Sequence, residues 1–260
     1  MKHLIFLLPG AVFIFLLCAY IPAFHSAYQR RADPSSYMPV STVMAVASGT
    51  IAESHKTIFL TMDMDMNEAM LRKYQKGLVQ EWYDPRIFAY LEKERIPATF
   101  FVSGLFAETY PDLMRSLAST TMFSFQNHSY DESGFIPHCY WLTPLVTPQE
   151  KIAQIEETQT ILEHITGQKP RYFRYPGLCS GKGDDALVQS LGLEINEGNI
   201  FASDPFNPDG NRIANHILAR LKNNGVILMH IGGPNAPASY DVLRKIVPAI
   251  RARGYIFEKL

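Results

Sequence analysis

The chain has 260 residues, of which 47% are hydrophobic and 19% are charged, and its formal net charge is −1. This composition is that of a globular protein with a real hydrophobic core, and it excludes an intrinsically disordered chain. Because the net charge is close to zero and no block of like charges stands out, no strong field draws in a polyanion, so we expect no nucleic-acid partner.

The first two dozen residues differ from the rest of the chain. Lys2 and His3 precede an uncharged, largely apolar run from Leu4 to Ile21. Such a run is typical of a secretory signal, and it is also nearly as long as the about 20 apolar residues that span a bilayer. Residues 1–24 are therefore predicted to be either a signal peptide or a membrane anchor, and residues 25–54, which show no sustained period, a linker.

Both alternatives export the remaining chain to the periplasm, the cell envelope or the extracellular space, and the second also attaches it to a membrane. Disulfides persist in these compartments. With Cys18 inside the N-terminal segment, two cysteines remain. An even number in an exported domain predicts a Cys139–Cys179 disulfide, and the alternative is two separate buried thiols.

From residue 55 onward, short β-type runs alternate with segments of helical spacing. Strands are expected at 57–61, 98–102, 122–126, 172–175, 193–197, 226–229 and 255–258. Helices are expected at 67–83, 85–95, 110–118, 147–164, 184–191, 211–222 and 240–253. This alternation predicts a parallel sheet, and about seven such units without a break in composition favour one barrel-like α/β domain over residues 55–260.

In such folds the active site lies at the carboxyl ends of the strands. A carboxylate and an imidazole there can hold a divalent metal, which polarises a carbonyl and activates water, while a second carboxylate and a second histidine move protons. This chemistry suits hydrolysis of an amide or ester. The polar residues that follow or end the expected strands are Asp63, Asp65, Asn127, His128, Arg174, Asn199, Asp204 and His230.

Five motifs, taken together and in order, resemble those of the polysaccharide deacetylases, a family of carbohydrate esterases with the NodB-homology domain. The resemblance covers residues 55–260 and implies a distorted (β/α) barrel of about seven strands. It also implies a metal-dependent N-deacetylase that acts on amino-sugar residues of a glycan, either peptidoglycan or a chitin-like polymer. The motifs are Thr61-Met-Asp-Met-Asp65, Ala98-Thr-Phe-Phe-Val102, Asn127-His-Ser-Tyr130, Phe173-Arg-Tyr-Pro-Gly177 and Val226-Ile-Leu-Met-His230.

The resemblance implies a role for each residue that moves a proton. Asp63 matches the general base, and Arg174 matches the residue that pairs with that base. His230 matches the general acid. Asp204, with Asn199 as the alternative, stands where the family orients this histidine.

The resemblance also implies a site for a divalent metal, zinc in the first place, with cobalt, manganese or nickel as alternatives. Asp65 and His128 match two of its ligands. The family has a second histidine four residues after the first, but this chain has Glu132 there. Three interpretations remain open. Glu132 replaces the imidazole as ligand, or His138 takes its place, or the metal is absent and the protein is a catalytically impaired glycan-binding protein of the envelope.

Three further features bear on the substrate. The backbone N–H near Gly177 is expected to stabilise an oxyanion, as the resemblance implies. The segment Gly232-Gly-Pro-Asn-Ala236 is expected to be a turn that shapes the substrate groove and carries no chemistry of its own. Four aromatic side chains either stack on sugar rings or cover the mouth of the barrel: Tyr130, Phe135, Tyr140 and Trp141.

Overall fold

The computed structural model describes residues 55–260, so the predicted signal or anchor and the predicted linker lie outside the described residues. The described residues belong to one compact unit. None of the helices between residues 55 and 260 combines the length and the apolar character that crossing a membrane requires.

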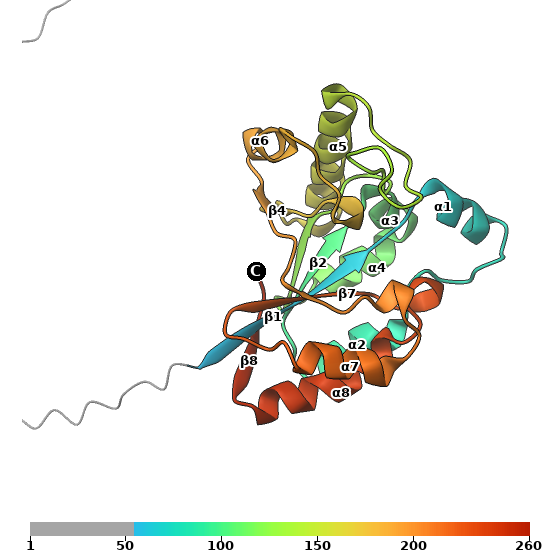
Figure 1. Ribbon diagram of the computed structural model, residues 1–260. Coiled ribbons are helices and arrows are strands. Elements are labelled where there is room, and N and C mark those ends of the chain that lie inside the picture. The colour runs from blue at the N-terminus through green and yellow to red at the C-terminus, as the bar shows by residue number, and fades with distance from the viewer. Residues whose placement is uncertain (1–54) are drawn as a thin grey trace, which may run out of the picture. The chain divides into compact units, whose positions relative to one another are not determined.

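A parallel sheet forms the centre of the domain (Figure 1). Its strands follow the order β5-β4-β3-β2-β1-β7-β6, and β8 pairs with the start of β1. Every strand pair is parallel, as the alternation of strands and helices predicted. The strands are β1 (Lys56–Met64), β2 (Ala98–Val102), β3 (Phe123–Asn127), β4 (Tyr172–Phe173), β5 (Glu194–Ile195), β6 (Ile200–Phe201), β7 (Gly225–His230) and β8 (Tyr255–Glu258).

The sheet is curled. Its two edge strands, β5 and β6, lie at opposite ends of the strand order, yet only residues 196–199 separate them in the chain. So short a segment spans at most about 18 Å when fully extended. The two edges must therefore approach each other, which gives the predicted distorted barrel in the form of a curled, seven-stranded half-barrel.

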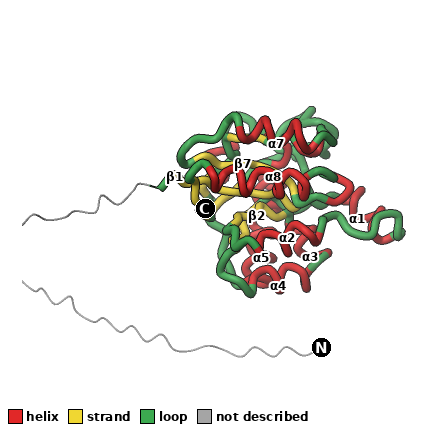
Figure 2. Tube along the Cα trace, turned by 90° about the horizontal axis from the view of Figure 1, so that it is seen from below, coloured by secondary structure: helices red, strands yellow, loops and turns green. Residues whose placement is uncertain are grey.

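Helices surround the strands (Figures 1 and 2). Helices α7 and α8 pack against each other, and α3 and α4 both pack against α5. Their amphipathic faces supply the core residues between helix and sheet. The helices are α1 (Glu68–Gln75), α2 (Pro85–Lys93), α3 (Gly104–Thr109), α4 (Pro111–Ala118), α5 (Pro148–Thr166), α6 (Asp184–Ser190), α7 (Gly210–Leu218) and α8 (Ser239–Ala252).

The expected helix over 67–83 is wrong in its second half. Helix α1 begins after Asn67, whose side chain accepts hydrogen bonds from two backbone N–H groups, and it ends at Gln75. Gly77 then adopts a left-handed φ of 67°, which turns the chain away from the helix axis. Val79 and Tyr83 still pack on the core, so the apolar spacing beyond the turn reflects packing of a loop.

Two elements were missed in the sequence. Helix α3 has six residues and follows β2 almost directly, and β6 has two residues. Both are too short for hydrophobic spacing to reveal, since a helical pattern is recognised over about 11–18 residues and a strand pattern over about 4–8. Strand β6 matters for the site, because Asp204 follows it and does not follow the expected strand at 193–197.

The predicted disulfide between Cys139 and Cys179 is present. It joins the long loop between β3 and α5 to the short turn that follows β4, across 40 residues of sequence. The two segments are therefore fixed to each other at the carboxyl end of the sheet.

Replacing both cysteines with serine should lower the free energy of unfolding by about 2–4 kcal/mol, because the crosslink restricts the unfolded chain. Guanidinium denaturation followed by circular dichroism measures this loss. Under a reducing agent the wild-type chain and the double variant should have the same unfolding midpoint. Equal midpoints under oxidising conditions as well would contradict the prediction.

Candidate active site

The carboxyl ends of three strands, β1, β3 and β7, bring the predicted residues together. Across the β1–β7 pair, Asp63 is in register with His230. On the other side of β1, β3 ends at Asn127, which directly precedes His128. A pocket of about 340 Å³ opens here, and Asp63, Asp65, His128, Glu132 and His230 all line it. Sequence reasoning therefore placed five chemically active side chains in one pocket.

Arg174 is fully buried behind the pocket, and its guanidinium holds Asp63. Its Nη1 donates to Oδ1 of Asp63 at 2.5 Å, and its Nη2 donates to the hydroxyl of Thr61 at 2.9 Å. Its Nε donates to the carbonyl of Asn196 at 3.0 Å, and the guanidinium lies 3.8 Å from the ring centre of Phe101. The arginine is thus fixed on every side, and it fixes the carboxylate in turn.

Asp63 stays ionised in this environment. Burial by itself raises the pKa of its carboxyl, but the attraction of Arg174, His128 and His230 together with the hydrogen bond from Arg174 outweighs burial, so the pKa lies below its ordinary value. Since Arg174 occupies Oδ1, the other oxygen, Oδ2, is available to accept a proton within the pocket.

His128 presents a lone pair to the pocket. Its Nδ1 lies 2.9 Å from the carbonyl oxygen of Arg174, which can only accept, so Nδ1 carries the proton. In the neutral ring Nε2 is then the acceptor, as in metal-bound histidines whose other nitrogen donates to a carbonyl. Three carboxylate oxygens face it, Oε1 of Glu132 at 3.4 Å, Oδ1 of Asp65 at 3.6 Å and Oδ2 of Asp63 at 3.8 Å.

Two of these oxygens, Oδ1 of Asp65 and Oε1 of Glu132, are buried and have no hydrogen-bond partner among the described residues. Burial raises the pKa of Asp65, and burial followed by repulsion from Asp65 and Asp63 raises the pKa of Glu132 well above its ordinary value. Unpaired buried oxygens of this kind cost free energy. A divalent cation next to His128 would satisfy both, so these residues fit a metal.

Two sets of metal ligands are possible. Both contain Asp65 and His128, and they differ in whether Asp63 or Glu132 is the third ligand. The donor atoms of Asp63, Asp65 and His128 all lie within 4.8 Å of one another, and Glu132 is outside this set although it faces His128. The oxygens of Asp65 and Glu132 lack partners, whereas Asp63 already has Arg174. His138 is exposed and does not line the pocket, so the structure gives no support to the interpretation that it replaces the missing imidazole.

His230 is held by Asp204, as the resemblance implied. Oδ1 of Asp204 lies 2.9 Å from Nδ1 of the histidine, and Oδ2 accepts from its backbone N–H and from the hydroxyl of Ser239. Burial lowers the pKa of His230, but Asp204 and Asp65 outweigh it and raise the pKa to about 10. The alternative partner, Asn199, lies elsewhere and accepts from the backbone N–H of Val226.

Sequence reasoning missed four supporting residues. Thr61 lies two positions before Asp63 on the same face of β1, and this period-two spacing was the one available signal. Asn196 contributes from the loop between β5 and β6, and Ser239 from the first position of α8, and no motif marks either residue. Asn235, in the segment 232–236, contacts the site through Nδ2, which donates to Oδ2 of Asp65 at 3.5 Å.

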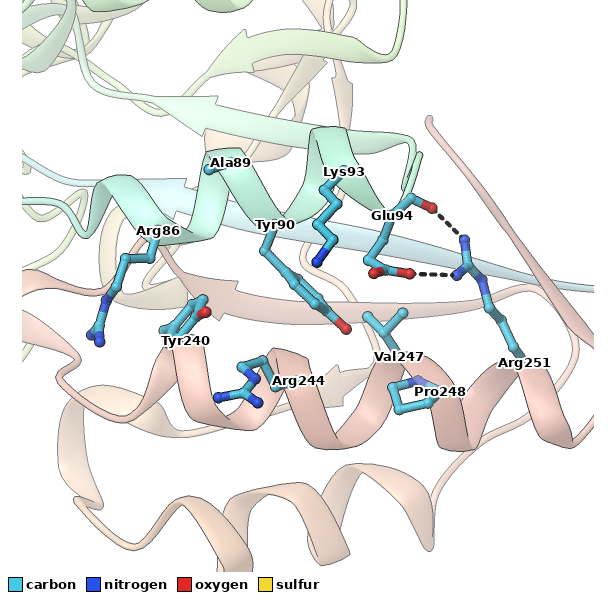
Figure 3. Close-up of a pocket in the computed structure, with 10 residues that line it drawn as sticks. All are labelled: Arg86, Ala89, Tyr90, Lys93, Glu94, Tyr240, Arg244, Val247, Pro248 and Arg251. Atoms are coloured by element: carbon cyan, nitrogen blue, oxygen red, sulfur yellow. Dashed lines mark hydrogen bonds and ion pairs between the residues drawn. The ribbon is translucent and has the colours of Figure 1, made fainter.

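A larger hollow of about 710 Å³ lies on the outside of the barrel between α2 and α8 (Figure 3). Its charged side chains are partly paired, since Arg251 donates to Glu94 and Arg86 donates to Asp84. The groove contains none of the predicted ligands or proton carriers. The smaller pocket at the strand ends is therefore the candidate active site.

Comparison with known proteins agrees with the motifs. Residues 51–195 match the family model described as polysaccharide deacetylase. A chitooligosaccharide deacetylase of Azorhizobium caulinodans is 28% identical over 188 residues, which cover 68% of this chain and 85% of the relative. A peptidoglycan-N-acetylglucosamine deacetylase of Bacillus cereus is 25% identical over 244 residues, which cover 93% of this chain and 81% of the relative.

Among solved structures, a CE4 family pseudoenzyme of Bacillus anthracis has the same fold. It superposes with a TM-score of 0.64 at 17% identity, over 80% of this chain and 64% of the pseudoenzyme, so the chain spans slightly less than two thirds of that neighbour. At this identity the likeness concerns the fold alone. The curled barrel described above is thus one that known proteins share.

Proposed function

Because the chain belongs to the polysaccharide deacetylase family, we propose that its pocket catalyses the metal-dependent removal of N-acetyl groups from amino-sugar residues of a glycan. The observation that carries this proposal is the pair of buried, unpartnered carboxylate oxygens of Asp65 and Glu132 that face Nε2 of His128. The two curated relatives act on chitooligosaccharide and on peptidoglycan by name, which supports a glycan of this class.

Asp65, His128 and Glu132 would hold the cation, with zinc as the proposed metal and cobalt, manganese or nickel as alternatives. Two carboxylates and one imidazole form a donor set of oxygen and nitrogen that suits all four. When bound, such a cation polarises the acetyl carbonyl and lowers the pKa of a water molecule.

The remaining residues move the protons. Oδ2 of Asp63 accepts a proton from the attacking water, whose oxygen forms a bond to the acetyl carbon. Nε2 of His230 then donates a proton to the amide nitrogen as the carbon–nitrogen bond breaks, which releases acetate and the free amine. The backbone at Gly177, which lines the pocket, is the proposed donor to the oxygen that becomes negative.

Asp204 acts through His230, and this makes a prediction about pH. Asp204→Asn removes the main charge that raises the pKa of His230 from 6.5 to about 10. Because the acid must be protonated, the alkaline limb of kcat/KM should move to lower pH in the variant. A pH–rate profile measures the shift, and an unchanged alkaline limb would refute the proposed pairing.

Glu132 makes a prediction about metal affinity. Glu132→Ala should weaken zinc binding by at least about 10–100-fold, since the loss of outer-shell partners alone costs that much. Glu132→His, which keeps a donor at the position, should bind zinc at least as well as the wild type. Isothermal titration of metal-free protein measures all three affinities. If the alanine variant binds zinc like the wild type, Glu132 is not a ligand.

Acetate release tests the proposed function. Purified protein should release acetate from chitotetraose or from peptidoglycan, and the comparison of the two names the substrate class. The alternative, a catalytically impaired glycan-binding protein, rests on Glu132 alone, and the position of that side chain against His128 favours ligation. Absence of acetate release from both glycans in the presence of zinc would favour the alternative.

We further propose that the domain is exported, through the signal peptide or anchor predicted at residues 1–24. The disulfide between Cys139 and Cys179 supports an oxidising compartment. Fractionation of cells that express the full chain, followed by N-terminal sequencing, distinguishes a cleaved signal from a retained anchor.

A further inference from the structure

The four aromatic residues that the sequence analysis grouped together fall into two pairs. Phe135 is 1% exposed and packs on Phe173 and Tyr175 in the core. Tyr130 is half-buried, and its hydroxyl donates to Glu108. These two cover the barrel. Tyr140 and Trp141 are 59% and 77% exposed and remain available to a ligand.

A third exposed ring joins this second pair. Phe206, which is 60% exposed, comes from the turn that also carries Asp204. The ring centre of Phe206 lies 5.7 Å from that of Tyr140, in a stacked arrangement, and 6.3 Å from that of Trp141. The ring centres of Tyr140 and Trp141 lie 5.9 Å apart. We call these three residues the aromatic platform. Single exposed aromatics are common, whereas a contiguous group of three marks a binding surface.

The aromatic platform is continuous with the candidate active site. All three of its residues line the same pocket as Asp63, Asp65 and His230, next to further apolar side chains. Among the described residues, no lysine or arginine lines this pocket. The aromatic platform itself consists of three uncharged side chains with flat apolar rings, so it suits a neutral ligand with an apolar face.

The aromatic platform is fixed to the turn that contains Gly177. The Cys139–Cys179 disulfide joins the two segments. Cys139 directly precedes Tyr140, and Cys179 directly follows Leu178. A Cβ at Gly177 would lie only 2.9 Å from Sγ of Cys139 and 3.1 Å from the ring of Tyr140, so the ring packs on bare backbone. Tyr140 itself has a left-handed φ of 49°, a conformation that is strained for a residue with a side chain. Such strain persists only where the surrounding structure enforces it, and strained residues are often found at binding sites.

We propose that the aromatic platform binds the apolar face of a neutral pyranose ring that neighbours the ring to be deacetylated. The ligand is then an oligosaccharide of at least two neutral rings, held with one ring at the strand ends and another on Trp141, Tyr140 and Phe206. This inference rests on the proposed function only in that the ring at the strand ends is taken to be the amino sugar that is deacetylated. It makes the three aromatic residues determinants of chain-length specificity.

The protein contains a built-in reporter for this contact. The chain has two tryptophans, and Trp82 is buried with its Nε1 bonded to the carbonyl of Met70. A change of tryptophan emission on ligand binding therefore comes from the exposed Trp141. In the full-length Asp63→Asn variant, whose turnover should be slow enough for a binding measurement, chitotetraose should shift the emission to shorter wavelength. N-acetylglucosamine at the same concentration of rings should leave it nearly unchanged.

Calorimetry with matched variants tests the energetics. Trp141→Ala and Phe206→Ala, each in the Asp63→Asn background, should weaken chitotetraose binding by about tenfold or more, the usual effect of removing an aromatic anchor. Val146→Ala is the control, because Val146 is 72% exposed on the same loop but lies outside the pocket. This control should bind chitotetraose as tightly as the background protein.

The outcomes separate this inference from the proposed function. Chitotetraose binding that is unchanged by both aromatic substitutions, or binding without a change of Trp141 emission, would overturn the platform. So would a protein that binds no chitotetraose at all. If the emission shift and the weakened variants are found while wild-type protein releases no acetate, the platform stands and the proposed deacetylase activity fails.

Discussion

Asp63→Asn is expected to lower the rate of acetate release by a factor of about 10²–10⁴, the usual contribution of a positioned general base. The amide is isosteric but cannot accept a proton from water at neutral pH. The same change should also destabilise the fold, because it leaves Arg174 fully buried without its carboxylate. Breaking a buried ion pair from one side costs about 3–5 kcal/mol, and the retained amide oxygen should place this variant near the lower end.

A surface ion pair provides the control for Asp63→Asn. Asp112 pairs with Arg115 at 2.7 Å, but its side chain is 95% exposed. Asp112→Asn should therefore change neither acetate release nor the unfolding midpoint. Thermal unfolding and acetate assays on both variants test the two effects separately. Near-normal turnover by the Asp63 variant would remove Asp63 from the role of base, whatever its stability.

His230→Ala is expected to lower amide hydrolysis by a similar factor, because an amine leaves poorly without a proton. The loss should depend on the leaving group. An aryl acetate releases a phenolate that needs no proton, so the variant should keep most of its activity on such an ester. Asp63→Asn should lose activity on both substrates, since both require activation of water.

The fold should tolerate the loss of the His230 ring. Asp204 keeps the hydroxyl of Ser239 and the backbone N–H at position 230 as donors. His164→Ala is the matched control, because His164 is exposed on α5 and lies outside the pocket. If His230→Ala loses ester and amide hydrolysis to the same extent, the histidine does not act as the acid for the leaving group.

The sequence predicted the site because catalytic side chains in such folds lie at the carboxyl ends of the strands. Once the strands at 57–61 and 226–229 are located by their apolar runs, Asp63 and His230 must meet at the same rim. Family resemblance added the partner of His230, and the structure places Asp204 there. Two residues support these groups, Asn196 from the loop between β5 and β6 and Ser239 from the first position of α8. Their contacts depend on tertiary packing, so no local pattern could identify them.

The curvature of the sheet was predictable only in outline. Strands β4, β5 and β6 have two residues each, which is too few for an alternating pattern. They form the two ends of the strand order, where the curled sheet approaches itself. Helix α1 shows the opposite error, in which core packing beyond Gly77 imitates helical spacing. In each case the tertiary structure decides what the local sequence leaves open.

Glu132 is the residue that the structure clarifies most. In the sequence it is a departure from the family's second metal-binding histidine. In the structure it is buried, its Oε1 lacks a partner, and this oxygen faces Nε2 of His128 at 3.4 Å beside an equally unpartnered oxygen of Asp65. This position supports the proposal that Glu132 is a metal ligand.

The most direct test of the central claim is acetate release from chitotetraose before and after removal of metal. Wild-type protein should release acetate, lose this activity when treated with a chelator, and regain it when zinc, or cobalt, manganese or nickel, is returned. Because the hydrophobic core is built from other residues than Asp65, His128 and Glu132, the fold should survive removal of the ion and the loss should be reversible. Full acetate release by protein shown to be free of metal would contradict the account.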